Sequence, residues 1–169
     1  MPQPRLIVDG YNLMHATGLM RERFGPGGLE RSRGRLLDLL ADLLEADDRA
    51  RTVVVFDARG GDHGYLSTQH DRGMRIEFPS RDREADDRIE QLIAENSAPK
   101  SLLIVSGDRR LHRAIRRRRG IAETGPQFLA RLNREREAVS PEREKPPAAV
   151  VSEREVAWWR RRIAELDAT

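Results

Sequence analysis

The sequence predicts an α/β protein built on a mainly parallel sheet. Three short apolar runs, several of their residues β-branched, each lead into an aspartate within 6–9, 53–57 and 102–108. Such runs are typical of strands buried on both faces. Segments with helical periodicity lie between them, so the first two strands are expected to run parallel within a β-α-β unit.

Composition limits the class of protein. A chain of 169 residues is long enough for one domain with its own core. It has no cysteine, which excludes a disulfide framework, a zinc-thiolate site and a thiol nucleophile. No apolar stretch approaches the ~20 residues of a membrane span, and the N-terminal segment has no hydrophobic signal region. A cytoplasmic location without membrane association is therefore expected.

The first half of the chain is expected to alternate between strand and helix. After the strand at 6–9, residues 25–28 are rich in glycine but lack the Walker A and dinucleotide-binding patterns, which favours a plain connector. Leucines spaced by three and four predict a helix over 29–46. A strand over 52–57 follows, and then a long polar loop over 58–73, a length typical of functional or disordered segments.

The second half continues the alternation. We expect, in order, a short strand, a helix, a buried strand, a helix, a short edge strand and a further helix, over 74–78, 85–95, 102–105, 109–118, 121–122 and 126–135.

The C-terminal part differs in composition. Proline and alternating charges predict a linker over 138–151 after a domain at 1–137. A helix is expected over 152–169, because Ser152 and Glu155 have the spacing of a capping box. This helix either docks on the domain or binds a partner, and docking is the preferred interpretation because it would cover the apolar face.

Acidic residues are concentrated where the strands end. Asp9, Asp57 and Asp108 each follow an apolar run, and Asp86 and Asp87 stand at the start of a predicted helix. Each alone has an ordinary explanation as a turn residue, a cap or a partner of the helix dipole. Together they predict one acidic site at the carboxyl edge of the sheet. Clustered carboxylates favour a bound cation, and all-oxygen ligands suit Mg²⁺ or Mn²⁺.

Two polar residues accompany these acids. Asn12 could hold Asp9 or bind a substrate phosphate, or it could simply form an Asx turn. Ser106 could donate to a neighbouring carboxylate or to a phosphate, or it could cap the helix that follows. The sequence leaves both alternatives open.

Four segments carry a resemblance to a known family. They are Val8-Asp9-Gly10-Tyr11-Asn12-Leu13, Val55-Phe56-Asp57, Ala85-Asp86-Asp87-x-Ile89 and Val105-Ser106-Gly107-Asp108-Arg109. In this order they resemble the motifs of NYN domains, a branch of the PIN-like nucleases, and within it the YacP-like bacterial group. The resemblance covers roughly residues 5 to 125, and the first segment is its most specific part.

The resemblance implies a PIN-like three-layer α/β/α sandwich and a metal-dependent endoribonuclease that hydrolyses RNA phosphodiester bonds. It implies single-stranded mRNA as the substrate and the ribosome as a partner, since the group includes a ribosome-associated endoribonuclease. The implied core of the site is Asp9, Asn12, Asp86 and Asp108, with Mg²⁺ or Mn²⁺ held by Asp9, Asp86 and Asp108. Asp57 and Asp87 are further candidate ligands, and Ser106 is an auxiliary residue.

The predicted helix that follows Asp108 is rich in arginine. With its apolar residues facing inward, this helix should direct four of them to solvent beside the acids: Arg109, Arg113, Arg116 and Arg117. Such a stripe would bind phosphates without sequence preference. The alternative is a solvated face in an arginine-rich protein, since only two of the 31 basic residues are lysine. The sequence does not indicate an oligomeric state.

Three other functions compete with the nuclease. A catalytically silent RNA- or ribosome-binding module would have the same fold, but the acid set is intact. A receiver domain needs a lysine at a late strand end, and neither Lys100 nor Lys145 stands there. A haloacid-type phosphatase needs Asp-x-Asp after the first strand, whereas the chain has Asp9-Gly10-Tyr11.

Overall fold

A computed structural model describes residues 3–20, 23–57, 66–80 and 84–139. Its strands are β1 (Leu6–Asp9), β2 (Thr52–Val55), β3 (Ser67–Asp71), β4 (Met74–Phe78), β5 (Leu103–Val105) and β6 (Ile121–Glu123). Its helices are α1 (Gly10–Ala16), α2 (Gly28–Leu43), α3 (Ala46–Arg49), α4 (Ala85–Glu95), α5 (Arg109–Arg117) and α6 (Gly125–Val139), with a 3₁₀ turn at Pro99–Ser101.

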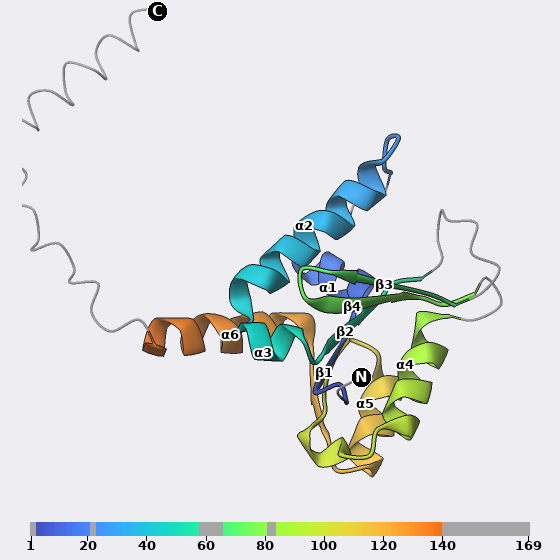
Figure 1. Ribbon diagram of the computed structural model, residues 1–169, viewed down its shortest axis with the longest axis vertical. Helices are drawn as coiled ribbons and strands as arrows, with labels where there is room; N and C mark the ends of the chain where they lie inside the picture. The colour runs from blue at the N-terminus through green and yellow to red at the C-terminus, as the bar shows by residue number, and fades with distance from the viewer. Residues whose placement is uncertain (1–2, 21–22, 58–65, 81–83, 140–169) are drawn as a thin grey trace, which may run out of the picture. The chain divides into compact units, whose positions relative to one another are not determined.

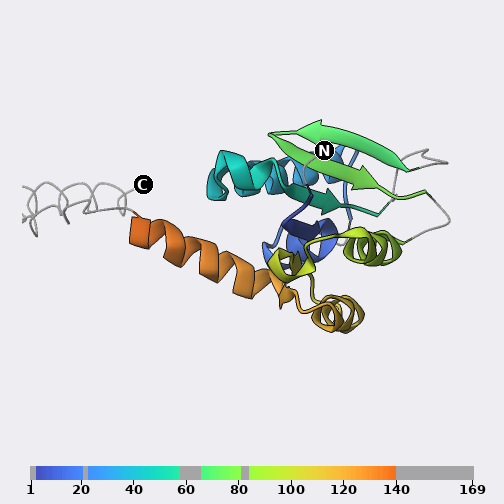
Figure 2. The same ribbon diagram turned by 60° about the horizontal axis from the view of Figure 1, so that its bottom comes forward.

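The strands form one mainly parallel sheet, which confirms the predicted fold class. Their order is β3-β4-β2-β1-β5-β6, and only β3 runs antiparallel to its neighbour. Helices α1 and α2 cover one face of the sheet, and α4 and α5 cover the other (Figures 1 and 2). Because the five parallel strands share one direction, their carboxyl ends meet at a single edge.

Successive side chains of the buried strands point to opposite faces of the sheet and pack into two separate hydrophobic cores. Leu6 and Val8 of β1 pack with Val54 on the face covered by α1, α2 and the first part of α6. Ile7 points the other way, toward Val53 and the apolar faces of α4 and α5. This period of two is what a strand buried between two helical layers requires.

The predicted elements hold except at three places. The segment 58–73, predicted as a loop, includes strand β3. Its side chains are polar and mostly exposed at the sheet edge, so the sequence lacks the apolar pattern of a strand there. Arg72 and Gly73 turn it back onto β4, both with positive φ. The seven-residue helix α1 was not predicted, and the helix expected over 29–46 is divided into α2 and α3. Residues 58–65 lie outside the described part.

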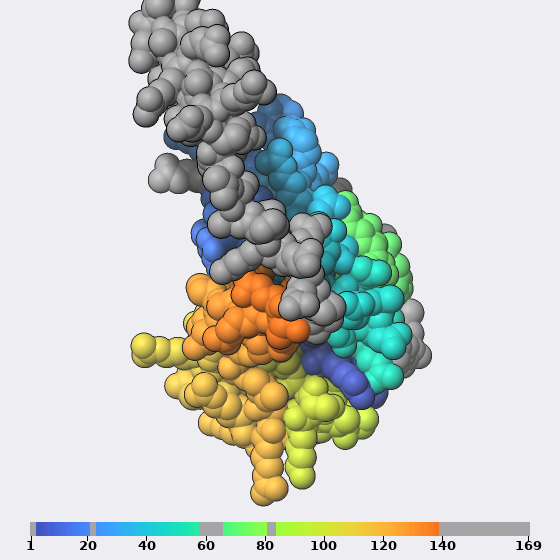
Figure 3. Space-filling view, turned by 90° about the vertical axis from the view of Figure 1, so that its left-hand side faces the viewer, coloured from blue at the N-terminus to red at the C-terminus, as the bar shows by residue number. Residues whose placement is uncertain are grey.

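Helix α2 lies at the surface beside the β3–β4 hairpin (Figure 3). Asp38 of α2 forms an ion pair with Arg72 of the hairpin turn, with 2.6 Å between Oδ1 and Nε. Arg49 of α3 packs over Gly73 in the same turn. These contacts attach the hairpin turn to the helical layer, which compensates for the polar, mostly exposed side chains of the edge strand β3.

Contacts divide the chain into two units, Met1–Arg136 and Glu137–Thr169. Helix α6 runs to Val139, so the first two residues of the segment predicted as a linker are helical. The rest of that segment and the helix predicted over 152–169 lie outside the described residues. Among the described helices, none has the length and apolar character needed to cross a membrane.

Candidate functional site

The carboxyl edge of the sheet gathers acidic residues from separate parts of the chain. Asp9 is the last residue of β1, and Asp57 and Asp108 follow the ends of β2 and β5. The register aligns Val8 with Val105, which places Asp9 next to Ser106 across the two strands. Parallel pairing therefore converts three distant sequence positions into neighbours.

Both oxygens of Asp9 accept a hydrogen bond. The backbone N–H of Asn12 donates to Oδ1 over 3.1 Å, which makes Asp9 the N-cap of α1. The hydroxyl of Ser106 donates to Oδ2 over 2.9 Å. The carboxylate is thus held in one orientation by the strand end on one side and the helix start on the other.

Ser106 and Asn12 connect this carboxylate to the loop after β5. Ser106 is fully buried, and its Oγ also accepts the N–H of Asp108 over 3.1 Å. The Asn12 Oδ1 accepts the N–H of Gly107 over 2.8 Å. A Cβ on Gly107 would lie 2.8 Å from the Asn12 Nδ2, so a larger residue here would displace the Asn12 side chain. Both polar residues therefore contact the acidic edge, and α5 is capped by Asp108 itself through the N–H of Arg110.

Helix α4 delivers a fourth carboxylate to the same edge. The Asp57 Oδ1 accepts the N–H of Ala85 over 2.7 Å, so the end of β2 caps the start of α4. This bond directs the next residue, Asp86, toward the strand ends, where its carboxyl group hydrogen-bonds with Asp108. Asp57 and Asp9 lie near enough for their charges to act on Asp86 as well.

The electrostatics reflect this crowding. Burial, the hydrogen bond with Asp108 and the neighbouring negative charges raise the pKa of Asp86 to about 7. Burial also raises the pKa of Asp9, against the effect of its two hydrogen bonds. The pKa of Asp108 is lowered, chiefly because the Arg110 N–H stabilises its charged form. Of this pair, Asp86 therefore favours the protonated form and Asp108 the ionised form.

The donor set suits a hard divalent cation. All four carboxylates offer oxygen, and a cation would relieve the repulsion between their charges, which contributes to the raised pKa of Asp86. Within the described ranges, no three His, Asp or Glu side chains are positioned to hold a metal ion as they stand. Binding a cation would therefore require these carboxylates to rotate from their present positions.

The YacP-like NYN domain model matches residues 6–167, nearly the whole chain. The chain belongs to the YacP-like NYN domain family. This is a family of PIN-like nucleases, and membership supports an RNase-type function. The four sequence motifs that resemble this family are the ones that the fold brings to the acidic edge.

Two crystal structures share the fold of this YacP-like NYN domain. One is Rae1 (YacP) from Bacillus subtilis, with 24% sequence identity, a TM-score of 0.58 and coverage of 97% of each chain. The other is a single-substitution mutant of that protein, with 23% identity, a TM-score of 0.56 and coverage of 78% of this chain and 77% of the other. No curated protein sequence matches this chain significantly.

Asp87 lies apart from the four converging acids of the YacP-like NYN domain. Its carboxylate is exposed and pairs with Arg110 over 2.8 Å, in a group that also includes Glu90. The predicted arginines Arg109, Arg113, Arg116 and Arg117 are all exposed on α5. Of these, Arg113 is close enough to Asp108 for its charge to lower the pKa of that carboxyl.

Arg33 of α2 also lies at this edge, and the sequence did not predict it. Its guanidinium carbon lies 5.3 Å, 5.5 Å and 5.1 Å from the ring centres of Tyr11, Phe56 and Phe78. It also donates to the Tyr11 hydroxyl and, over 3.4 Å, to the backbone carbonyl of Asp57. No spacing distinguishes it from the many other arginines, so only the fold reveals that it ties α1 to the end of β2.

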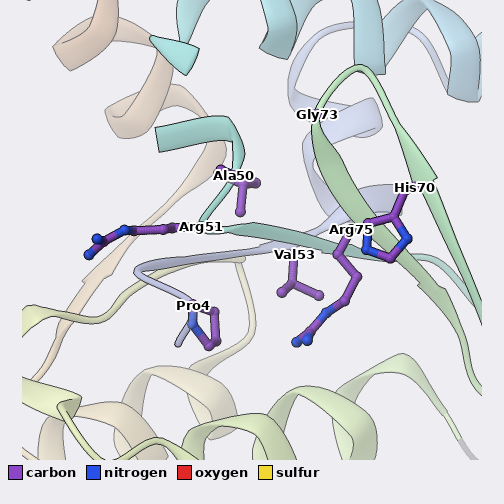
Figure 4. A pocket seen from close by; sticks show the side chains of 8 residues that line it. Pro4, Ala50, Arg51, Val53, His70, Gly73 and Arg75 are labelled. Atoms are coloured by element: carbon purple, nitrogen blue, oxygen red, sulfur yellow. The ribbon is translucent and has the colours of Figure 1, made fainter. Parts of the chain in front are cut away.

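A pocket of about 260 Å³ lies at the opposite, amino edge of the sheet (Figure 4). Val53 and Pro4 form its apolar centre, with Arg75 and His70 beside them. None of the converging acids lines it. The chemistry of the YacP-like NYN domain is therefore to be sought at the carboxyl edge, where the acids converge.

Proposed function

We propose that this protein is a metal-dependent endoribonuclease that hydrolyses phosphodiester bonds of single-stranded RNA. The observation that carries the proposal is the convergence of Asp9, Asp57, Asp86 and Asp108 from four segments at one sheet edge. Repulsion between crowded carboxylates lowers the stability of the folded state. A site for a cation that cleaves phosphodiester bonds explains why they are placed together.

Each residue has a distinct part in this proposal. Asp9, Asp86 and Asp108 would hold Mg²⁺ or Mn²⁺, with Asp57 as a further ligand. The cation supplies an activated water and neutralises charge on the phosphate. Ser106 keeps Asp9 oriented and favours its ionised form. The Asn12 Oδ1 is occupied by the Gly107 N–H, which leaves its amide N–H groups to donate to a substrate phosphate.

The cleavage assay tests the proposal directly. Labelled single-stranded RNA is incubated with Mn²⁺, with Mg²⁺ or with EDTA, using the wild type, Asp9→Asn and the control Asp87→Asn. We expect metal-dependent cleavage that Asp9→Asn abolishes and Asp87→Asn retains, because Asp87 is paired with Arg110 outside the site. Cleavage that survives Asp9→Asn would refute the site.

The exposed arginines of α5 are proposed to bind the RNA backbone beside the acids. Neutralising Arg113, Arg116 and Arg117 together should weaken RNA binding and reduce its salt dependence, since each lost phosphate contact removes about 0.7 from the slope of log K against log salt. Fluorescence anisotropy over a range of salt concentrations measures this slope. An unchanged slope would show that these arginines are only a solvated face.

We propose mRNA on the ribosome as the natural substrate, on family resemblance alone. If the isolated protein binds RNA without cleaving it, the same variants are compared on translating ribosomes. Cleavage there, lost in Asp9→Asn, would support a ribosome-presented substrate. Binding without cleavage in both settings would instead indicate a catalytically silent RNA-binding module.

A further inference from the structure

A second basic site lies at the start of α2, outside the acidic edge. It is a small, mainly polar pocket of about 190 Å³ between the first turns of α2 and the residues that precede it. Its lining includes three exposed arginines, Arg23, Arg31 and Arg35. None of the three forms an ion pair with another of the described residues.

The helix terminus adds to this positive charge. Gly27 precedes α2 with a φ of 64° and has no side chain that could cap the first N–H groups. The Arg31 Nη1 lies 3.1 Å from the position that a Cβ on Gly27 would occupy, and its Nη2 donates to the Pro26 carbonyl over 3.2 Å. A guanidinium is therefore held beside the positive end of the helix dipole, an arrangement that favours an anion.

A buried hydroxyl also belongs to the pocket. Ser32 lines it, although the residue is only 8% exposed. Its Oγ has no hydrogen-bond partner among the residues that the structure describes. Because Ser32 lines the pocket, its hydroxyl can donate a hydrogen bond to an anion bound there.

We propose that this pocket binds a backbone phosphate of the RNA substrate, away from the bond that is cleaved; the inference rests on the proposed function. The same turn of α2 carries Arg33, which reaches the Asp57 carbonyl at the acidic edge. Helices α2 and α5 cover opposite faces of the sheet (Figures 1 and 2). An RNA strand bound by both would cross the carboxyl edge, where the four acids converge.

Binding measurements in EDTA separate this inference from catalysis. The probes are a labelled single-stranded RNA of about 12 nucleotides, long enough for an extended site, and a dinucleotide. The variant Arg31→Gln/Arg35→Gln removes two pocket charges, and Ser32→Ala removes the hydroxyl. The matched control, Arg51→Gln/Arg134→Gln, removes two exposed charges outside the pocket. Thermal melting verifies that each variant folds.

We expect the pocket variant to weaken binding of the longer RNA roughly tenfold and to reduce the salt slope by about 0.7, the loss of one phosphate contact. Ser32→Ala should also weaken binding of the longer RNA. Neither variant should change binding of the dinucleotide. An equal loss in the control pair, or no loss in the pocket variant, would overturn the inference. Wild-type cleavage with unchanged RNA binding in the pocket variant would refute the pocket alone. The expected binding loss, with no wild-type cleavage either of free RNA or on translating ribosomes, would refute only the nuclease.

Discussion

Replacing Asp86 by asparagine should stabilise the metal-free protein at about pH 8. Burial and neighbouring carboxylates raise the pKa of Asp86 from 3.8 to about 7. Since the folded state favours the protonated form, the stability contributed by this group is complete below about pH 4 and is lost as the pH rises through about 7. Above that range the folded protein must retain an unfavourable negative charge, which asparagine removes.

The size of the effect follows from the shift. A pKa change of one unit corresponds to about 1.4 kcal/mol, which sets an upper bound of about 4 kcal/mol for Asp86. The carboxyl group is partly exposed, so solvent screening reduces the expected gain to about 1–2 kcal/mol. At about pH 5 only the part of this penalty that develops between pH 3.8 and pH 5 is present, so the gain should be less than half of that at about pH 8.

Urea denaturation in EDTA at about pH 5 and about pH 8 measures this difference. The control is Asp87→Asn, because the adjacent carboxylate is exposed and paired with Arg110. Asp87→Asn should change the free energy of unfolding by no more than about 0.5 kcal/mol at both pH values. If Asp86→Asn changes the free energy of unfolding equally at both pH values, the carboxylates do not converge as described. Adding Mg²⁺ should raise the free energy of unfolding of the wild type more than that of Asp86→Asn.

Three further changes test the supports of the site. Ser106→Ala removes the hydroxyl between Asp9 and the loop after β5, and should lower the free energy of unfolding by about 1–2 kcal/mol in urea denaturation; an unchanged value would contradict that bond. Gly10→Ala would place a Cβ 2.4 Å from the buried Phe56 ring, and overpacking should cost about 1–3 kcal/mol in the same assay. Arg33→Met should reduce RNA cleavage and lower the melting temperature, and Arg33→Lys should not restore either, because lysine lacks the planar guanidinium that stacks on the rings; full recovery by lysine would show that charge alone suffices.

The sequence alone determined the parallel core and the position of most of the acids. Apolar runs of strand length can be buried only between helical layers, and parallel strands present their carboxyl ends at one edge. Asp9, Asp57 and Asp108 therefore had to approach one another. The periodicity of α4 and α5 likewise determined their buried faces, and Arg113 is exposed as expected.

Only the tertiary structure decided how these groups connect. The Asp57 bond to the Ala85 N–H orients α4, so that Asp86 joins the site while Asp87 turns to Arg110. Ser106 donates to a carboxylate 97 residues away, and no local pattern encodes that choice of partner. Hydrophobic periodicity reports burial of a whole face, whereas hydrogen bonds between distant polar groups depend on strand register and helix placement, which form only when the chain packs.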